Sequence, residues 1–81
     1  MSIKEKVLEL VKENSEKKIN ITPDCDLKED AGIDSFEYLM IINALEDEFH
    51  VQIDETKYQH LRTVTQITEE LVKNYPVIGK N

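Results

Sequence analysis

Apolar residues recur along this chain at intervals that fit helices. Near the N-terminus, four of them are spaced by four, three and one residues, which places them on one side of a helix. They are Ile3, Val7, Leu10 and Val11. Ser2 followed by Glu5 has the pattern of a capping box, in which two side chains satisfy free N–H groups at a helix start. These features predict a first helix from about Ile3 to about Ser15.

The same reasoning predicts a second helix from Ser35 to about His50. Asp34 followed by Glu37 repeats the capping-box pattern, with Asp34 as the N-cap and Ser35 as the first helical residue. The apolar side of this helix is expected to face the core. Its residues are Leu39, Ile42, Leu45 and Phe49, with Ile41 beside them. The residues expected largely outside that side are Glu37, Met40, Asn43, Ala44, Asp47 and Glu48.

The rest of the pattern predicts two more helices and a long loop. A short helix is expected near Thr56 to His60, and a last helix from about Val64 to Asn74, which Pro76 ends. The segment from Lys17 to Ile33 lacks a helical period and contains a turn signal at residues 22–24. The expected fold is therefore all-α: a small bundle of four helices, three of them substantial, with a long loop after the first.

Length and composition bound what such a bundle can do. The 81 residues show no repeat or linker, so one domain over residues 1–81 is expected, with a core too small to enclose an enzyme cleft. The N-terminal segment is charged throughout, and no run approaches the ~18 apolar residues of a membrane helix. The lone Cys25 offers no internal disulfide and no redox motif. We expect a cytoplasmic monomer that does not insert into membranes.

Charge is unevenly distributed along the chain, whose formal net charge is −7. Between Asp24 and Glu55 there are eleven acidic residues and one basic residue, Lys28, whereas the remainder carries six acidic and nine basic residues. An acidic field of this kind repels nucleic acid and steers the protein toward basic patches on other proteins. The expected partners are therefore proteins with basic docking patches, and not nucleic acids.

Ser35 is placed for modification more than for catalysis. A nucleophilic serine needs a base, usually a histidine held by a carboxylate, and oxyanion donors. His50 and His60 lie far along the chain, and no pattern brings either of them to Ser35. At the first position of a helix, the hydroxyl is surrounded by free N–H groups and the positive end of the helix dipole, where a phosphate is favoured. We therefore expect no catalytic residue and no enzyme; plain helix capping is the alternative reading.

Four acidic residues around this helix start approach the spacing of a calcium-binding loop. They are Asp26, Asp30, Asp34 and Glu37, at positions one, five, nine and twelve of such a loop. Position three, however, is the cation Lys28, and glycine comes at position seven, as Gly32, where position six requires it. The sequence therefore predicts no metal site.

Residues 30–55 resemble the acyl carrier protein family. The attachment motif of that family is usually Asp-Ser-Leu, followed by a helix that ends in an acidic cluster and Phe, and then by Ile and further acids. The corresponding segments here are Asp34-Ser35-Phe36, Glu46-Asp47-Glu48-Phe49 and Ile53-Asp54-Glu55. Length, acidity, Asp26-Leu27 and Thr63-Val64 extend the resemblance over essentially the whole chain.

The resemblance implies that Ser35, flanked by Asp34, is esterified with 4′-phosphopantetheine, which a phosphopantetheinyl transferase takes from coenzyme A. The thiol of this arm would carry acyl groups as thioesters to partner enzymes of fatty acid, lipid or polyketide-like biosynthesis. The residues expected to contact partners are Glu37, Met40, Ile41, Glu46, Asp47 and Glu48. The residues expected near a shielded acyl chain are Leu45, Ile53, Leu61 and Ile67.

Three residues of the second helix depart from the family pattern. Phe36, Met40 and Asn43 stand where carriers of primary fatty acid synthesis commonly have Leu, Glu and Met. Because these residues lie on the expected docking side, an aminoacyl or peptidyl carrier of a specialised pathway stays open as an alternative. A second alternative, from another class of protein, is an acidic helical interaction module that carries no prosthetic group.

Overall fold

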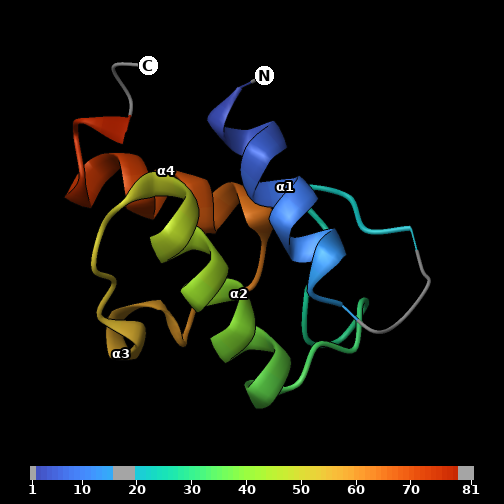
Figure 1. The fold of residues 1–81 in the computed structure, drawn as a ribbon. Coiled ribbons are helices and arrows are strands. Elements are labelled where there is room, and N and C mark those ends of the chain that lie inside the picture. Colours follow the sequence, from blue (N-terminus) through green and yellow to red (C-terminus); the bar gives the residue numbers. More distant parts are fainter. Residues whose placement is uncertain (1, 16–19, 79–81) are drawn as a thin grey trace.

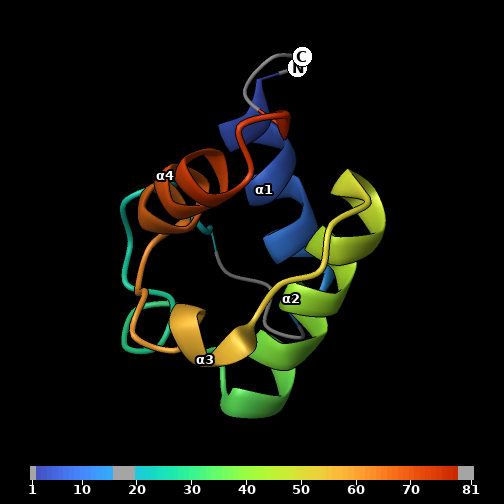
Figure 2. The same cartoon turned by 90° about the vertical axis from the view of Figure 1, so that its left-hand side faces the viewer.

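The helices predicted from the sequence are all present in the computed structural model, which describes residues 2–15 and 20–78. These residues form four helices and no strand, in the order α1 (Ile3–Glu13), α2 (Ser35–Phe49), α3 (Glu55–Tyr58) and α4 (Val64–Asn74). Helix α1 packs against both α4 and α2, and α3 lies beside the first turns of α2 (Figures 1 and 2). The predicted all-α bundle, with three longer helices and one short helix, is confirmed.

Each of the three longer helices begins with a capping box. The sequence predicted the boxes of α1 and α2. Ser2 caps α1 and Asp34 caps α2, each with the glutamate three residues later, as predicted. Helix α4 begins in the same way, at Thr63 with Gln66. An N-cap of this kind contributes about 1 kcal/mol of stability. The helix starts are therefore fixed by local sequence.

The ends of α1 and α2 fall slightly earlier than predicted. Helix α1 stops at Glu13 and not at Ser15, because the side-chain amide of Asn14 donates a hydrogen bond of 2.8 Å to the carbonyl of Leu10. Helix α2 stops before His50, whose backbone turns to the left-handed region with φ 56° and so caps the helix.

The short helix α3 begins one residue earlier than predicted and ends two residues earlier. The Asp54 carboxylate caps it by accepting hydrogen bonds from the N–H of Thr56 at 3.1 Å and from its hydroxyl at 2.6 Å. The bounds of α4 agree with the prediction. None of the helices in the described part of the chain is long and apolar enough to cross a membrane.

One apolar core joins the helices to the long loop. The buried residues from the helices include Val7, Val11, Ile41, Ile42, Leu45, Tyr58, Val64, Ile67 and Leu71, and those from the loop are Ile21, Leu27, Ala31 and Ile33. The prediction was wrong at Leu39, which is 40% exposed, whereas Tyr38 beside it is only 7% exposed. Tyr38 tolerates burial because its hydroxyl donates a hydrogen bond of 2.6 Å to the Tyr58 carbonyl. The buried side of α2 is thereby turned toward α3.

The loop before α2 is held against the start of α4. The Leu27 N–H donates to the Arg62 carbonyl at 2.7 Å, and the Thr65 N–H donates to the Pro23 carbonyl at 3.1 Å. The N–H of Glu29, followed by the Arg62 guanidinium, holds the pKa of Asp26 below its ordinary value. Residues 17–19 of the predicted loop lie outside the described residues. The described part of the loop thus presents a fixed approach to α2.

Candidate functional site

The loop delivers Ser35 to the start of α2 through a sharp turn. Gly32 has φ 67°, a left-handed conformation that glycine adopts without the steric cost of a Cβ atom. The next residue, Ile33, is buried, and its N–H donates to the Leu27 carbonyl at 2.8 Å. Because both sides of the turn are held, the chain leaves the core at Asp34 and the exposed Ser35 becomes the first residue of α2.

The cap of α2 is made by Asp34, which precedes Ser35, and by Glu37, two residues after it. An Asp34 carboxylate oxygen accepts a hydrogen bond of 2.8 Å from the Glu37 N–H. In return, a Glu37 carboxylate oxygen accepts one of 3.2 Å from the Asp34 N–H. Asp34 therefore has the predicted capping role, while the hydroxyl of Ser35 stays outside the capping box. It lies at the positive end of the α2 dipole, where an attached phosphate is favoured.

The two histidines are placed elsewhere in the fold. His50 caps the opposite end of α2, which at 15 residues is roughly 22 Å long. His60 follows α3 and is not among the residues that line the pocket next to Ser35. Neither histidine therefore borders the pocket next to Ser35.

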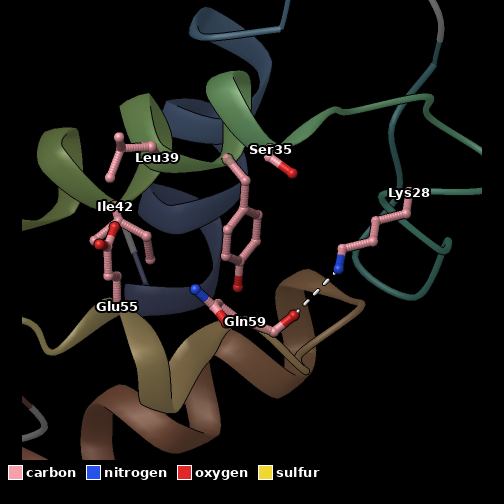
Figure 3. A pocket seen from close by; sticks show the side chains of 7 residues that line it. Lys28, Ser35, Leu39, Ile42, Glu55 and Gln59 are labelled. Atoms are coloured by element: carbon pink, nitrogen blue, oxygen red, sulfur yellow. Dashed lines mark hydrogen bonds between the residues drawn. The ribbon is translucent and has the colours of Figure 1, made fainter.

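A pocket of about 250 Å³ opens beside Ser35, between α2 and α3 (Figure 3). Its lining residues are Lys28 from the loop, Ser35, Tyr38, Leu39 and Ile42 from α2, and Glu55 and Gln59 from the α3 region. The ammonium of Lys28 donates a hydrogen bond of 3.2 Å to the Gln59 carbonyl and so joins the loop to α3 (Figure 3). The pocket combines an apolar wall on α2 with polar groups opposite.

This pocket was not predicted from the sequence, and the prediction concerned another part of the fold. It placed a shielded acyl chain near four other residues, which the structure buries in the core at 0–8% exposure. These residues are Leu45, Ile53, Leu61 and Ile67. No local signal in the sequence marks the pocket, because its lining residues come from three separate segments.

The Tyr38 hydroxyl ties α2 to the Tyr58 carbonyl of α3. Burial, with the neighbouring Tyr58, raises the pKa of Tyr38 well above its ordinary value. Burial also raises the pKa of Tyr58. Since an ordinary tyrosine already titrates near pH 10, both hydroxyls stay protonated throughout the physiological range. The Tyr38 hydroxyl therefore keeps its hydrogen bond to the Tyr58 carbonyl over that range, while the Tyr58 hydroxyl accepts one of 3.2 Å from Asn74 of α4.

The residues that were predicted to contact partners differ in their exposure to solvent. Met40 is 43% exposed, and Asp47 and Glu48 are also exposed. Two of the predictions need correction. Ile41 is fully buried because it packs into the core, and Glu37 is only 7% exposed because it turns back to the cap of α2.

Glu46 and Glu48 differ in their contacts with the rest of the protein. Glu46 is half-buried, and its carboxylate accepts a hydrogen bond of 2.8 Å from the Ile53 N–H. Glu48 faces Lys6 of α1 at 3.9 Å, an exposed pair of little energetic weight. The acidic end of α2 thus offers mainly Asp47 and Glu48 to solvent.

Phe36 and Leu39 add an apolar feature that the predicted contact set did not contain. Phe36 is 68% exposed and Leu39 is 40% exposed, and both lie with Met40 in the first two turns of α2. We refer to Phe36, Leu39 and Met40 as the apolar strip. The exposed side of the first two turns of α2 is therefore largely apolar.

Metal ligands are not assembled near this site. Among residues 2–15 and 20–78, no three His, Cys, Asp or Glu side chains are arranged to hold a metal ion. Asp26, the first residue of the calcium-like spacing, accepts hydrogen bonds from the N–H groups of Lys28 and Glu29, both at 2.9 Å. Its carboxylate stabilises the turn in which it lies.

Comparisons with known proteins agree on one family. The family model described as "Phosphopantetheine attachment site" matches residues 5–71. The acyl carrier protein of Phytoplasma mali is 34% identical over 80 residues, which cover 94% of this chain and 95% of that protein. The acyl carrier protein of Chlorobium phaeobacteroides is 36% identical over 72 residues, or 88% of this chain and 92% of that protein. No solved structure gives a significant match.

The match extends over most of the chain and includes the loop, α2 and α3. Acyl carrier proteins hold a covalently attached 4′-phosphopantetheine, which a phosphopantetheinyl transferase supplies. They interact with biosynthetic enzymes and have no catalytic activity of their own. This chain belongs to the acyl carrier protein family.

Proposed function

We propose that Ser35 is the attachment site of the 4′-phosphopantetheine arm and that the protein delivers acyl groups, held as thioesters on this arm, to partner enzymes. The observation that supports this most directly is that the residues that cap α2 do not include Ser35. Asp34 and Glu37 make the cap, and the exposed hydroxyl between them is left outside it. A phosphodiester on Ser35 therefore replaces no hydrogen bond of the cap.

The residues around Ser35 fit a phosphodiester and the arm that follows it. The α2 dipole and Lys28 provide positive charge, and the pocket beside Ser35 provides an apolar wall. The arm supplies the thiol chemistry, while the chain holds the arm and presents it to other proteins. Ser35 acts as the substrate of the transferase, and the carrier itself needs no general base.

Partner enzymes dock, in this proposal, on the exposed side of α2. The apolar strip lies next to the attachment site and provides contact area, and Asp47 and Glu48 provide charge at the other end. Exposed charges of this kind speed association and leave it salt-sensitive, while contributing little to affinity. Weak association suits a carrier that visits several enzymes in turn.

The proposed cargo is an acyl group of fatty acid, lipid or polyketide-like biosynthesis. The relatives compared above are named acyl carrier proteins, which favours acyl over aminoacyl cargo. Membership of this family argues against an acidic module without a prosthetic group. The pathway could be assigned by offering the loaded carrier to synthases of each type.

Intact-mass measurement tests the attachment. The apo protein is incubated with coenzyme A and a broad-specificity phosphopantetheinyl transferase, with Ser35→Ala as the matched variant. We expect the wild type to gain the mass of one phosphopantetheine and the variant to gain none, while circular dichroism shows the same helicity for both. Loading of the variant, or no loading of a folded and unmodified wild type, would refute the proposal.

A further inference from the structure

We infer that Lys28 and the pocket beside Ser35 form a resting site for the first part of the arm, with the Lys28 ammonium bound to the phosphodiester. This inference rests on the proposed attachment at Ser35. The ligand it assigns is a phosphodiester anion followed by the pantoyl unit of the arm, which carries two methyl groups, a hydroxyl and an amide. The site would hold the arm on the carrier between visits to partners.

Lys28 is an isolated cation with unused donors. It is the single basic residue among eleven acidic ones between Asp24 and Glu55. Its ammonium donates to the Gln59 carbonyl at 3.2 Å, and no carboxylate in the described part of the chain forms an ion pair with it. An ammonium carries three N–H groups. Lys28 can therefore bind an anion and keep its bond to α3.

The attachment atom and this cation border the same pocket. Ser35 and Lys28 both line it, and Figure 3 shows the Ser35 hydroxyl on the side of the pocket toward Lys28. A phosphodiester on Ser35 enters a region where acidic residues repel it, among them Glu55 of the same pocket, so a cation that borders this pocket has a large effect on where the phosphodiester settles. Lys28 is the pocket residue with the charge to offset that repulsion.

The pocket suits the part of the arm nearest the protein. Its rim contains the attachment atom, so the pantoyl unit reaches it first, and the thiol lies two amide-linked units further on. The pocket volume of about 250 Å³ corresponds to roughly eight waters at about 30 Å³ each, which is the scale of one such unit and not of the whole arm. Leu39 and Ile42 offer an apolar wall to the methyl groups, and Gln59 offers polar atoms opposite (Figure 3).

Attachment makes a weak site of this kind effective. The arm is tethered at the rim, so its local concentration at the pocket is high and its docking costs little entropy. A partner with a stronger basic patch would withdraw the phosphodiester from Lys28 by competition. The distal part of the arm and its thiol remain outside and available.

Nuclear magnetic resonance of the loaded carrier tests the site. The arm is installed from isotope-labelled coenzyme A, and intact mass first establishes that each sample is loaded. In the wild type we expect nuclear Overhauser effects from the pantoyl methyl groups to Leu39 and Ile42, and an order parameter above ~0.6 for the arm amide nearest the phosphate. Lys28→Gln should lose these contacts and bring the order parameter below ~0.6, whereas Lys28→Arg should retain both.

Lys57→Gln is the matched control, because Lys57 is an exposed lysine of α3 that does not line the pocket. Lys57→Gln should leave the contacts and the order parameter of the arm unchanged. If it lost them as Lys28→Gln does, the effect would come from overall charge and the inference would be overturned. A loaded wild type in which both arm amides are equally mobile would also overturn it, while leaving attachment intact. A wild type that accepts no arm would instead refute the attachment.

A salt titration of the wild type avoids any disturbance of α3 by substitution. Raising the salt from about 0.01 M to about 1 M shortens the Debye length from about 30 Å to about 3 Å. The order parameter of the first arm amide should then fall to the level of Lys28→Gln. An order parameter that does not change with salt would overturn the role of the Lys28 charge.

Discussion

The two ends of α2 are built from different chemistry. At its start, Asp34 and Glu37 cap the helix and the exposed residues are the apolar strip. At its end, Asp47 and Glu48 are exposed, and the last turn carries no basic residue. Carboxylates near a helix C-terminus oppose the helix dipole by roughly 0.3–1 kcal/mol each. The start of α2 is thus favourable for stability, and the end is not.

If partners dock on α2 as proposed, the two ends of the helix would act at different stages of the approach. Charge acts over about 8–10 Å at ordinary salt, so acids at the far end of α2 can orient an approaching partner before contact. Apolar surface acts only at contact, and here it adjoins Ser35. The charge that steers a partner and the apolar surface that contacts it therefore lie at different ends of α2, and substitutions can change one without the other.

The largest effect on stability is expected from a buried residue in the middle of α2. Ile41 is fully buried in the middle of α2, so Ile41→Ala should lower the free energy of unfolding by about 2–5 kcal/mol. Met40→Ala, one residue earlier, should change it by at most about 0.5 kcal/mol, because Met40 is exposed. Urea denaturation of both variants measures the contrast. Equal losses would mean that α2 does not bury the side described here.

A smaller effect is expected at the start of α2. Asp34→Ala removes the N-cap and should cost about 1 kcal/mol, within a range of about 0.5–2 kcal/mol. The Glu37 N–H loses its acceptor, so the first turn frays and Ser35 is presented less firmly, which should also slow loading by the transferase. Asp34→Asn is the control, since asparagine caps nearly as well. If Asp34→Ala were as stable as the wild type, the Asp34 side chain would not stabilise the start of α2.

The smallest change in stability is expected at the acidic end. Asp47→Asn combined with Glu48→Gln should raise the free energy of unfolding by about 0.5 kcal/mol, because two carboxylates no longer oppose the dipole and the loss of the Lys6–Glu48 pair offsets part of that gain. The same variant should react with partner enzymes several-fold more slowly at low salt and normally at high salt. Stopped-flow transfer at two salt concentrations measures this. A slower rate at both would assign these acids to close contact instead of steering.

Local signals account for what the sequence predicted well. The capping boxes at Ser2 and Asp34 are read from residues three apart, and they fix the starts of α1 and α2. Leu39 was misplaced because both Leu39 and Tyr38 can continue an apolar stripe with Ile42 and Leu45. The choice depends on α3, which supplies the carbonyl that the Tyr38 hydroxyl needs.

The pocket was beyond local signals for the same reason. Its residues come from the loop, α2 and α3, and Lys28 and Gln59 meet across 31 positions of sequence. No periodic pattern encodes such a meeting, because it depends on how the loop packs against α4 and on where α3 is held. The attachment motif, in contrast, is one continuous segment, and it carried the family resemblance.

Helix α3 has too few residues to persist by itself. Four residues complete barely one turn, and an isolated helix of that length is unstable in water. Its last turn is instead held from outside, by the Tyr38 hydroxyl on the Tyr58 carbonyl and by Lys28 on the next carbonyl, that of Gln59. The Tyr58 side chain is also buried in the core, and its hydroxyl accepts a hydrogen bond of 3.2 Å from Asn74 of α4. One side of the pocket is thus a single helical turn that exists only while the rest of the fold holds it in place.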